Sequence, residues 1–292
     1  MNDTFDKLVA EAPYGRVERL SPLVRRVLAP NPSPFTFTGT GTYIVGNGKI
    51  AIIDPGPADE AHLEAVAAAV EGEEVTHHLI THTHVDHSPG AAPLKARLGG
   101  KVAGCAPLIL SDDGPRADAA FDRTYAPDQV LADGEALQGP DWTLRAVHTP
   151  GHTSNHLCFA LEEEGILFSG DHVMGWSTTV VAPPDGDMAA YMRSLQLLLE
   201  RGDKRYFPTH GPAVEEPQRF VRGLIAHRRQ RETQILKLLA EGVAKIPDMV
   251  AQMYAPVDPR LWPAAERSVL AHLIDLESRS RVQRDGENWK PC

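Results

Sequence analysis

Cysteine is scarce in this sequence, and no two cysteines stand at a metal-binding spacing. The three that occur, Cys105, Cys158 and Cys292, are far apart and odd in number. Disulfide-stabilised domains are dense in cysteine, and thiolate zinc sites carry Cys-x-x-Cys pairs. We therefore expect neither a disulfide framework nor a thiolate metal site.

Long apolar runs and targeting signals are also missing. No stretch approaches the ~18 consecutive apolar residues that cross a bilayer as a helix. The N-terminal segment MNDTFDKLVAEAPYG lacks the basic-then-apolar pattern of a secretory signal. The same segment is too acidic and too poor in arginine for a mitochondrial transit peptide. We expect a cytoplasmic protein with no membrane partner.

The chain has no excess of positive charge that would attract nucleic acid. Its formal net charge is −10. Residues 1–212 hold 16 Lys and Arg against 28 Asp and Glu, whereas residues 213–292 hold 13 against 11. Binding to a phosphate backbone by electrostatics alone needs a basic surface, which this balance does not provide. Metal cations gathered at one site would offset part of the acidic excess.

Apolar periodicity predicts alternating strands and helices from residue 42 onward. Prolines at positions 22, 30, 32 and 34 indicate an irregular segment before that point. Two β-rich runs flank Asn47-Gly48, a pair typical of hairpins. Residues 111–128 contain five Asp and two Pro and predict an exposed loop. The pattern predicts strands over 42–45, 49–53, 75–80, 101–104, 142–147, 156–161, 166–169 and 206–207, and helices over 58–70, 188–199 and a short stretch ending near 98.

The C-terminal part has its own pattern. A long helix is predicted from Pro217 to about Ala240, followed by a segment interrupted by prolines and a second helix over 264–276. Two short strands are expected around Asp285-Gly286. A helix, a helix and a hairpin make a small α+β unit. We place the boundary near residue 215, which gives two predicted domains, 1–215 and 216–292.

The strongest chemical signal is His82-x-His84-x-Asp86-His87. Imidazole and carboxylate groups are suitable zinc ligands. Four such side chains within six residues are costly to bury without a metal. Three further ligand-type residues, His152, Asp171 and His210, each follow an expected strand, and strand ends can converge on one rim of a sheet. The sequence therefore predicts a metal site built from seven side chains.

These ligands divide naturally between two zinc ions. The arrangement we favour uses Asp171 as a bridge, with three ligands on each side: His82, His84 and His152 for the first ion, and Asp86, His87 and His210 for the second. Zinc lowers the pKa of bound water to about 7, so hydroxide is available at neutral pH. Asp86, beside that hydroxide, is the expected catalytic residue that orients it and accepts its proton. A single zinc ion, or iron or manganese, in the same pocket stays open.

The order of these motifs resembles the metallo-β-lactamase superfamily. The resemblance covers nearly all of residues 40–212, through His-x-His-x-Asp-His, the Thr-Pro-Gly-His segment 149–152, the Ser-Gly-Asp segment 169–171 and the glycine-flanked His210. It implies an α+β protein, an αβ/βα sandwich with the metal site at one edge between the sheets. It also implies the ligand roles given above.

A narrower resemblance is to the lactamase-β-like-two branch of that superfamily. It rests on Ser169-Gly170-Asp171-His172 with Thr178-Thr179-Val180, on the helix that carries Arg228 and Arg231, and on the ending near Trp289-Lys290. The branch carries a C-terminal winged-helix domain, which matches the predicted unit 216–292. Its known member is an endoribonuclease that cleaves single-stranded RNA.

The expected function is dinuclear zinc-dependent hydrolysis, with hydroxide attacking a phosphodiester of single-stranded RNA. One alternative is a thioester or ester hydrolase of the hydroxyacylglutathione type, because glyoxalase II shares all seven ligands, although its C-terminal half is helical. Another is a non-catalytic nucleic-acid-binding regulator. Asp171 stands where some lactamases have cysteine, so antibiotic hydrolysis is not expected.

Several further residues are candidates for supporting roles. His156 follows His152 by four residues and is a candidate for orienting a ligand or touching the substrate. Thr178, Thr179, Arg228 and Arg231 are further candidates, the arginines as contacts for an anionic substrate. The substrate is a small molecule or single-stranded RNA. The C-terminal unit is expected to pack on the catalytic domain or to form a homodimer.

Overall fold

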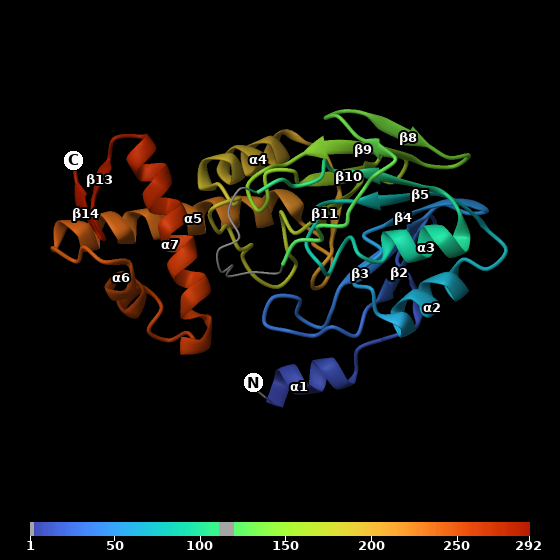
Figure 1. Cartoon of the computed structure of the whole chain (residues 1–292), viewed down its shortest axis with the longest axis horizontal. Helices are drawn as coiled ribbons and strands as arrows, with labels where there is room; N and C mark the ends of the chain where they lie inside the picture. The colour runs from blue at the N-terminus through green and yellow to red at the C-terminus, as the bar shows by residue number, and fades with distance from the viewer. Residues whose placement is uncertain (1–2, 111–119) are drawn as a thin grey trace.

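The computed structural model of the chain describes residues 3–110 and 120–292 (Figure 1). Among these residues, seven strands form one mixed sheet in chain order: β1 (Val17–Arg19), β2 (Val24–Leu28), β3 (Gly41–Val45), β4 (Lys49–Ile53), β5 (Glu74–Ile80), β6 (Lys101–Gly104) and β7 (Gln129–Val130). A second sheet contains, in spatial order, β12 (Arg205–Pro208), β11 (Ile166–Gly170), β10 (Leu157–Leu161), β9 (Thr143–His148) and β8 (Ala136–Gln138).

The two sheets pack face to face through alternating apolar residues. In β4, Ala51 and Ile53 point into a core that also contains Phe159 and Phe168 of the second sheet. The intervening residues of β4, such as Ile52, point to the opposite face and pack under helices. Since side chains alternate between the two faces of a strand, an apolar run without polar interruption is buried on both sides. This explains why β10, which is apolar throughout, is buried along its whole length.

Helices cover the outer face of each sheet. On the first sheet, α2 (Glu60–Ala69) and α3 (Ala91–Leu98) contribute Leu63, Val66 and Leu94 to the outer core. On the second, α4 (Met188–Glu200) contributes Tyr191 and Leu195. The resulting order of layers is the expected αβ/βα sandwich of the α+β class.

The C-terminal unit has a core of its own and shares one helix with the sandwich. It contains α5 (Pro217–Ala240), α6 (Ile246–Met253), the 3₁₀ turn η1 (Pro259–Leu261), α7 (Trp262–Ser278) and the hairpin β13 (Val282–Asp285) with β14 (Asn288–Pro291). Val221 and Leu224 of α5 pack against the sandwich, whereas Ile235 and Leu239 pack with Trp289 in the second core. Figure 1 shows α6 and α7 at the end of the molecule opposite α2 and α3.

The N-terminal segment departs from the expectation of irregular structure. It forms helix α1 (Asp3–Ala10) and two strands of the first sheet, β1 and β2. Arginines in the middle of β2 hide its apolar character in the sequence. They are accommodated by ion pairs, Arg25 to Glu73 at 2.6 Å and Arg26 to Glu18 at 2.7 Å.

Other short elements also escaped the sequence patterns. Helix α6 was missed because its segment contains prolines. It begins with Ile246-Pro247, and proline is tolerated in the first turn of a helix. Strands β7 and β8 are too short to produce a clear period. Of the loop expected over 111–128, residues 111–119 lie outside the described residues, and 120–128 contain no helix or strand. In the described ranges, no helix is both long and apolar enough to span a membrane.

The buried imidazole of His62 links helix α2 to the first sheet. Its Nε2 atom lies 2.9 Å from Thr42 Oγ1, which itself donates to the carbonyl oxygen of Asp54. The Nε2 atom is therefore the protonated donor. The Nδ1 atom is buried and has no hydrogen-bond partner among residues 3–110 and 120–292. Burial lowers the pKa of His62 to about 4, so a second proton on this ring opposes folding.

We expect His62 to reduce stability in acid. Its ring takes up a proton near pH 6.5 in the unfolded chain but only near 4 in the folded one, so stability present above pH 6.5 is lost as the pH falls. Between pH 7 and pH 5 this should lower the free energy of unfolding by roughly 2 kcal/mol. Denaturant titrations of the protein and of a His62→Gln variant measure the difference. Equal losses in both proteins would contradict this role.

Candidate metal centre

The seven predicted ligands lie together at the edge where both sheets end. His82, His84, Asp86 and His87 occupy the loop after β5. His152 follows β9, Asp171 follows β11 and His210 follows β12, and each of these loops begins at the end of a buried strand. The topology thus brings four segments to one place, although they are up to 128 positions apart in the sequence.

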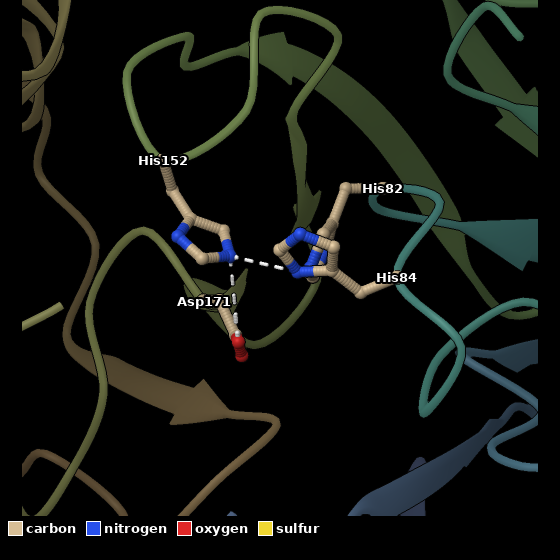
Figure 2. A group of neighbouring side chains, drawn as sticks. All are labelled: His82, His84, His152 and Asp171. Carbon is tan, nitrogen blue, oxygen red and sulfur yellow. Dashed lines mark hydrogen bonds and ion pairs between the residues drawn. The ribbon is translucent and has the colours of Figure 1, made fainter. Parts of the chain in front are cut away.

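The first group consists of three imidazoles and one carboxylate. The ligand-type atoms of His82, His84, His152 and Asp171 all lie within 4.8 Å of one another (Figure 2). His84 Nδ1 is 3.0 Å from His82 Nε2 and 3.1 Å from His152 Nε2. His152 Nε2 is 3.7 Å from Asp171 Oδ2. These atoms surround a single point, as the ligands of one tetrahedral ion would.

The second group lies next to the first. Atoms of Asp86, His87 and His210 also fall within 4.8 Å of one another. Asp171 reaches this group as well, because its Oδ1 is 3.4 Å from His210 Nε2 and its Oδ2 is 3.6 Å from His87 Nε2. One carboxylate therefore touches both groups.

The remaining nitrogen of several imidazoles is held by the protein. His82 Nδ1 lies 3.0 Å from Thr81 Oγ1. His152 Nδ1 donates to the carbonyl oxygen of Val180 at 2.6 Å, and His210 Nδ1 donates to that of Gly39 at 3.2 Å. Such contacts fix the tautomer and direct the free lone pair of each ring toward the centre.

Asp54 is a structural partner of this centre that the sequence patterns did not single out. Its side chain is fully buried and its backbone adopts the left-handed region, with φ of 46°. The Oδ1 atom accepts from Thr81 N, and Oδ2 accepts from Thr81 Oγ1, Thr209 Oγ1 and His87 Nδ1. The sequence did contain one signal for Asp54, because this residue, like His152 and Asp171, follows an apolar strand.

The charges of the centre oppose one another strongly. Burial and neighbouring imidazoles hold the pKa values of His82 and His84 well below the ordinary range, which leaves these rings neutral. Burial would raise the pKa of Asp171, but the charges of His210 and His87 hold it well below its usual range. Burial would lower the pKa of His210, but Asp171 and Asp86 raise it to about 10. Metal binds neutral imidazoles and ionised carboxylates, so an ion at the second group would take the place of the proton on His210.

The residues present fit a pair of metal ions. All seven residues are at most 9% exposed. Asp86 Oδ1 and His87 Nε2 are buried without a hydrogen-bond partner in the part of the chain that the structure describes. Buried polar atoms of this kind are rare unless something else satisfies them. Cations at the two groups would do so, and five nitrogen and two carboxylate ligands suit zinc.

The other expected residues lie around the centre in different ways. His156 is buried, and its Nε2 accepts from the backbone N–H of Asp171 at 3.1 Å. Thr179 Oγ1 donates to the carbonyl oxygen of Asp171 at 2.7 Å, and Arg228 Nη2 donates to that of Thr179. These three side chains therefore support the loop that carries Asp171. Thr178 and Arg231 line a neighbouring cavity and form no hydrogen bond or ion pair with the seven ligand side chains.

A cavity of about 330 Å³ opens beside the centre. Ligand side chains form one wall, and Phe35, Met174 and Val180 add an apolar one. Asn31, Ser33 and Thr36 complete the rim. These rim residues come from the segment that the sequence left without structure, and no pattern in it pointed to the site.

Two family models match the chain. One, described as the metallo-beta-lactamase superfamily, matches residues 36–210. The other, described as the beta-lactamase associated winged helix domain, matches residues 246–289. They confirm the resemblance seen in the motifs and the winged-helix character of the C-terminal unit.

Similar proteins occur in distant organisms. A Drosophila melanogaster protein named beta-lactamase-like protein 2 homolog is 35% identical, across 91% of this chain and 92% of its own length. An Aspergillus chevalieri protein named atrochrysone carboxyl ACP thioesterase is 33% identical, across 84% and 78%. The crystal structure of a beta-lactamase domain protein from Burkholderia ambifaria superposes with a TM-score of 0.79, across 100% and 99% of the two chains at 21% identity. The last comparison shows a shared fold.

We expect Asp54→Asn to weaken zinc binding by about 10- to 100-fold. Donors face both oxygens of Asp54, so either orientation of an amide places its NH₂ group against another donor. His87 then loses its orientation. Competition with a chromophoric chelator measures the affinity.

Asp248→Asn is the matched control for this change. Asp248 is exposed on α6, so its replacement removes the same charge far from the centre. Equal zinc affinity in the two variants would show that Asp54 does not position the ligands.

Proposed function

This chain belongs to the metallo-beta-lactamase superfamily of hydrolases, and we propose that it uses two zinc ions to hydrolyse an acyl thioester. The observation that carries the proposal is a buried seven-ligand set beside a cavity with an apolar wall. An acyl group can pack against Phe35, Met174 and Val180 while its carbonyl carbon lies next to the ligands. The name of the Aspergillus relative supports the same chemistry.

We assign the ligands according to the two groups. His82, His84 and His152 would hold one zinc ion, Asp86, His87 and His210 the other, and Asp171 would contact both. The distances from Asp171 to His152, His87 and His210, between 3.4 and 3.7 Å, support its shared position. Zinc bound there would lower the pKa of a coordinated water to about 7 and so supply a nucleophile at neutral pH.

Asp86 is the residue we assign to proton transfer. Its side chain lines the cavity, and its Oδ2 is 3.1 Å from His210 Nε2. The other oxygen, Oδ1, has no hydrogen-bond partner among the described residues. A carboxylate in this place can contact a bound ion and also orient an attacking water and accept its proton.

Cleavage of single-stranded RNA is the second candidate. Two-metal sites suit phosphodiesters because both the attacking and the leaving oxygen can be stabilised. Arg228 and Arg231 of α5 offer contacts for phosphate. Against this, residues 1–212 carry 28 acidic side chains against 16 basic ones. A non-catalytic regulator would have no use for seven buried ligands.

One experiment separates these possibilities. Zinc-loaded protein is given a hydroxyacyl-glutathione thioester and, separately, a fluorescent single-stranded RNA, with Asp171→Ala as the control. Hydrolysis of the thioester that is absent in the control supports the proposal. Cleavage of RNA alone would replace thioester hydrolysis with the nuclease function, and no turnover of either would remove both.

Replacing Asp86 should suppress turnover without unfolding the protein. We expect Asp86→Ala to lower kcat by about 10²- to 10⁴-fold, because the proton acceptor and one ligand are lost together. Asp248→Ala on the exposed side of α6 removes the same type of side chain and should leave kcat unchanged. Circular dichroism verifies the fold of both. Full activity in Asp86→Ala would exclude this residue from the reaction.

Removing the metal should abolish activity and also reduce stability. After dialysis against a chelator we expect a lower Tm, because metal bound only to the folded state stabilises it. Adding zinc should restore both Tm and turnover, and parallel additions of iron and manganese identify the preferred metal. A Tm that does not respond to any of the three ions would argue against a resident metal.

A further inference from the structure

A second cavity lies beside the metal centre, between the sandwich and the C-terminal unit. It measures about 220 Å³. Its walls come from the loop over residues 174–180, from α5 and from the segment 254–268. We call it the interdomain cavity. Phe35, Met174 and Val180 line both this cavity and the cavity beside the metal centre, which we call the metal cavity, so the two adjoin.

The interdomain cavity is lined by arginines that have no acidic partner among the described residues. Arg228 is 3% exposed, and its guanidinium donates to the Thr179 carbonyl oxygen and lies 5.2 Å from the centroid of the Tyr191 ring. Arg231 Nη1 donates to Gln234 Oε1 at 2.9 Å and to the carbonyl oxygen of Met253 at 3.3 Å. Neither arginine forms an ion pair with any residue in 3–110 or 120–292. By contrast, Arg25, Arg26 and Arg201, all partly buried, each pair with a carboxylate.

Arg231 and His227 are the groups best placed to take up a ligand. The Arg231 guanidinium lies 4.5 Å from the centroid of the Tyr254 ring, which holds it at the cavity wall. His227 also lines the cavity, and its Nδ1 has no hydrogen-bond partner within the described ranges. Burial, together with the charges of Arg228 and Arg231, lowers the pKa of His227 to about 4. The two arginines make the wall of the cavity electropositive, and the buried Nε atoms of both have no hydrogen-bond partner in the described ranges.

An anion would satisfy this arrangement. A guanidinium presents parallel N–H groups that match a carboxylate or phosphate, and such contacts are stronger away from bulk water. Tyr254, Val257 and Leu261 add apolar surface around the same space. This combination favours a short apolar group that ends in a negative charge over a long polyanion.

We propose that the interdomain cavity binds a carboxylate or phosphate group of the substrate, with Arg231 as the main contact and His227 beside it, while the scissile bond lies in the metal cavity. The identity of the scissile bond rests on the proposed function, whereas the anion site itself does not. The negative group belongs either to the acyl part or to the thiol part of the thioester. In both cases it determines which thioesters are accepted.

Matched thioesters test the proposal. Butyryl N-acetylcysteamine is neutral, succinyl N-acetylcysteamine carries a carboxylate on the acyl side, and butyryl thioglycolate carries one on the thiol side. In Arg231→Gln we expect the KM for one of the charged substrates to rise about tenfold or more, as for loss of a charge-assisted hydrogen bond. The KM for the neutral substrate should stay within about twofold of its value in the unmodified protein. The charged substrate whose KM rises reveals whether the acyl part or the thiol part of the thioester carries the anion.

Arg229→Gln is the matched control. Arg229 lies on the same helix, is exposed and does not line the interdomain cavity, so this variant loses the same charge without touching the site. Arg231→Lys, which keeps the charge, should recover part of the lost affinity. Identical KM values in Arg231→Gln and Arg229→Gln, or an equal rise for neutral and charged substrates in Arg231→Gln, would overturn the proposal.

A binding measurement keeps this inference distinct from the thioesterase proposal. Calorimetry with glutarate and with inorganic phosphate reports on the anion site in the zinc-loaded protein, whatever reaction it catalyses. We expect at least one of them to bind to the unmodified protein and to Arg229→Gln, with about tenfold weaker binding to Arg231→Gln. If no thioester is hydrolysed but this pattern holds, the anion site stands and the thioesterase function falls. If neither anion binds, or if all three proteins bind alike, the anion site falls.

Discussion

The hydrogen bonds to Asp54 determine the shape of the metal centre. Its carboxylate joins the end of β4 to the loop after β5, through Thr81 and His87, and to the loop after β12, through Thr209. Two of the four ligand-bearing segments are therefore held by one buried group. A single buried anion with four donors is stable because each donor offsets part of its lost hydration. The positions of the ligands in these two segments follow from this contact.

A single loop connects the metal centre to the C-terminal unit. Within residues 171–180, backbone oxygens accept from Thr179 Oγ1, from His152 Nδ1 and from the guanidinium of Arg228. This short stretch thus carries Asp171, accepts a hydrogen bond from the ring of His152 and accepts another from Arg228 of α5. The sequence order of these residues gives no hint of this, because their contacts lie between backbone and side chain across the fold.

The sequence allowed the centre to be predicted more completely than its surroundings. His82 to His87, His152, Asp171 and His210 were recognisable because each combines a ligand-type side chain with the end of an apolar strand. Strands β4 and β10 were recognisable from their apolar runs. In contrast, β2 was missed because paired arginines interrupt it, and α6 because prolines stand near its start. Asp54 and the rim residue Asn31 depend on tertiary contacts that local patterns do not encode.

The continuous course of α5 restricts how the protein can move. Many two-domain enzymes admit their substrates by rotating about a flexible linker. Here the first half of α5 belongs to one core and the second half to the other, without a linker between them in the described residues. A hinge at this point would break backbone hydrogen bonds of the helix. Adjustment to a ligand therefore comes from side chains and loops around the two cavities, such as Phe35 and Met174, which line both.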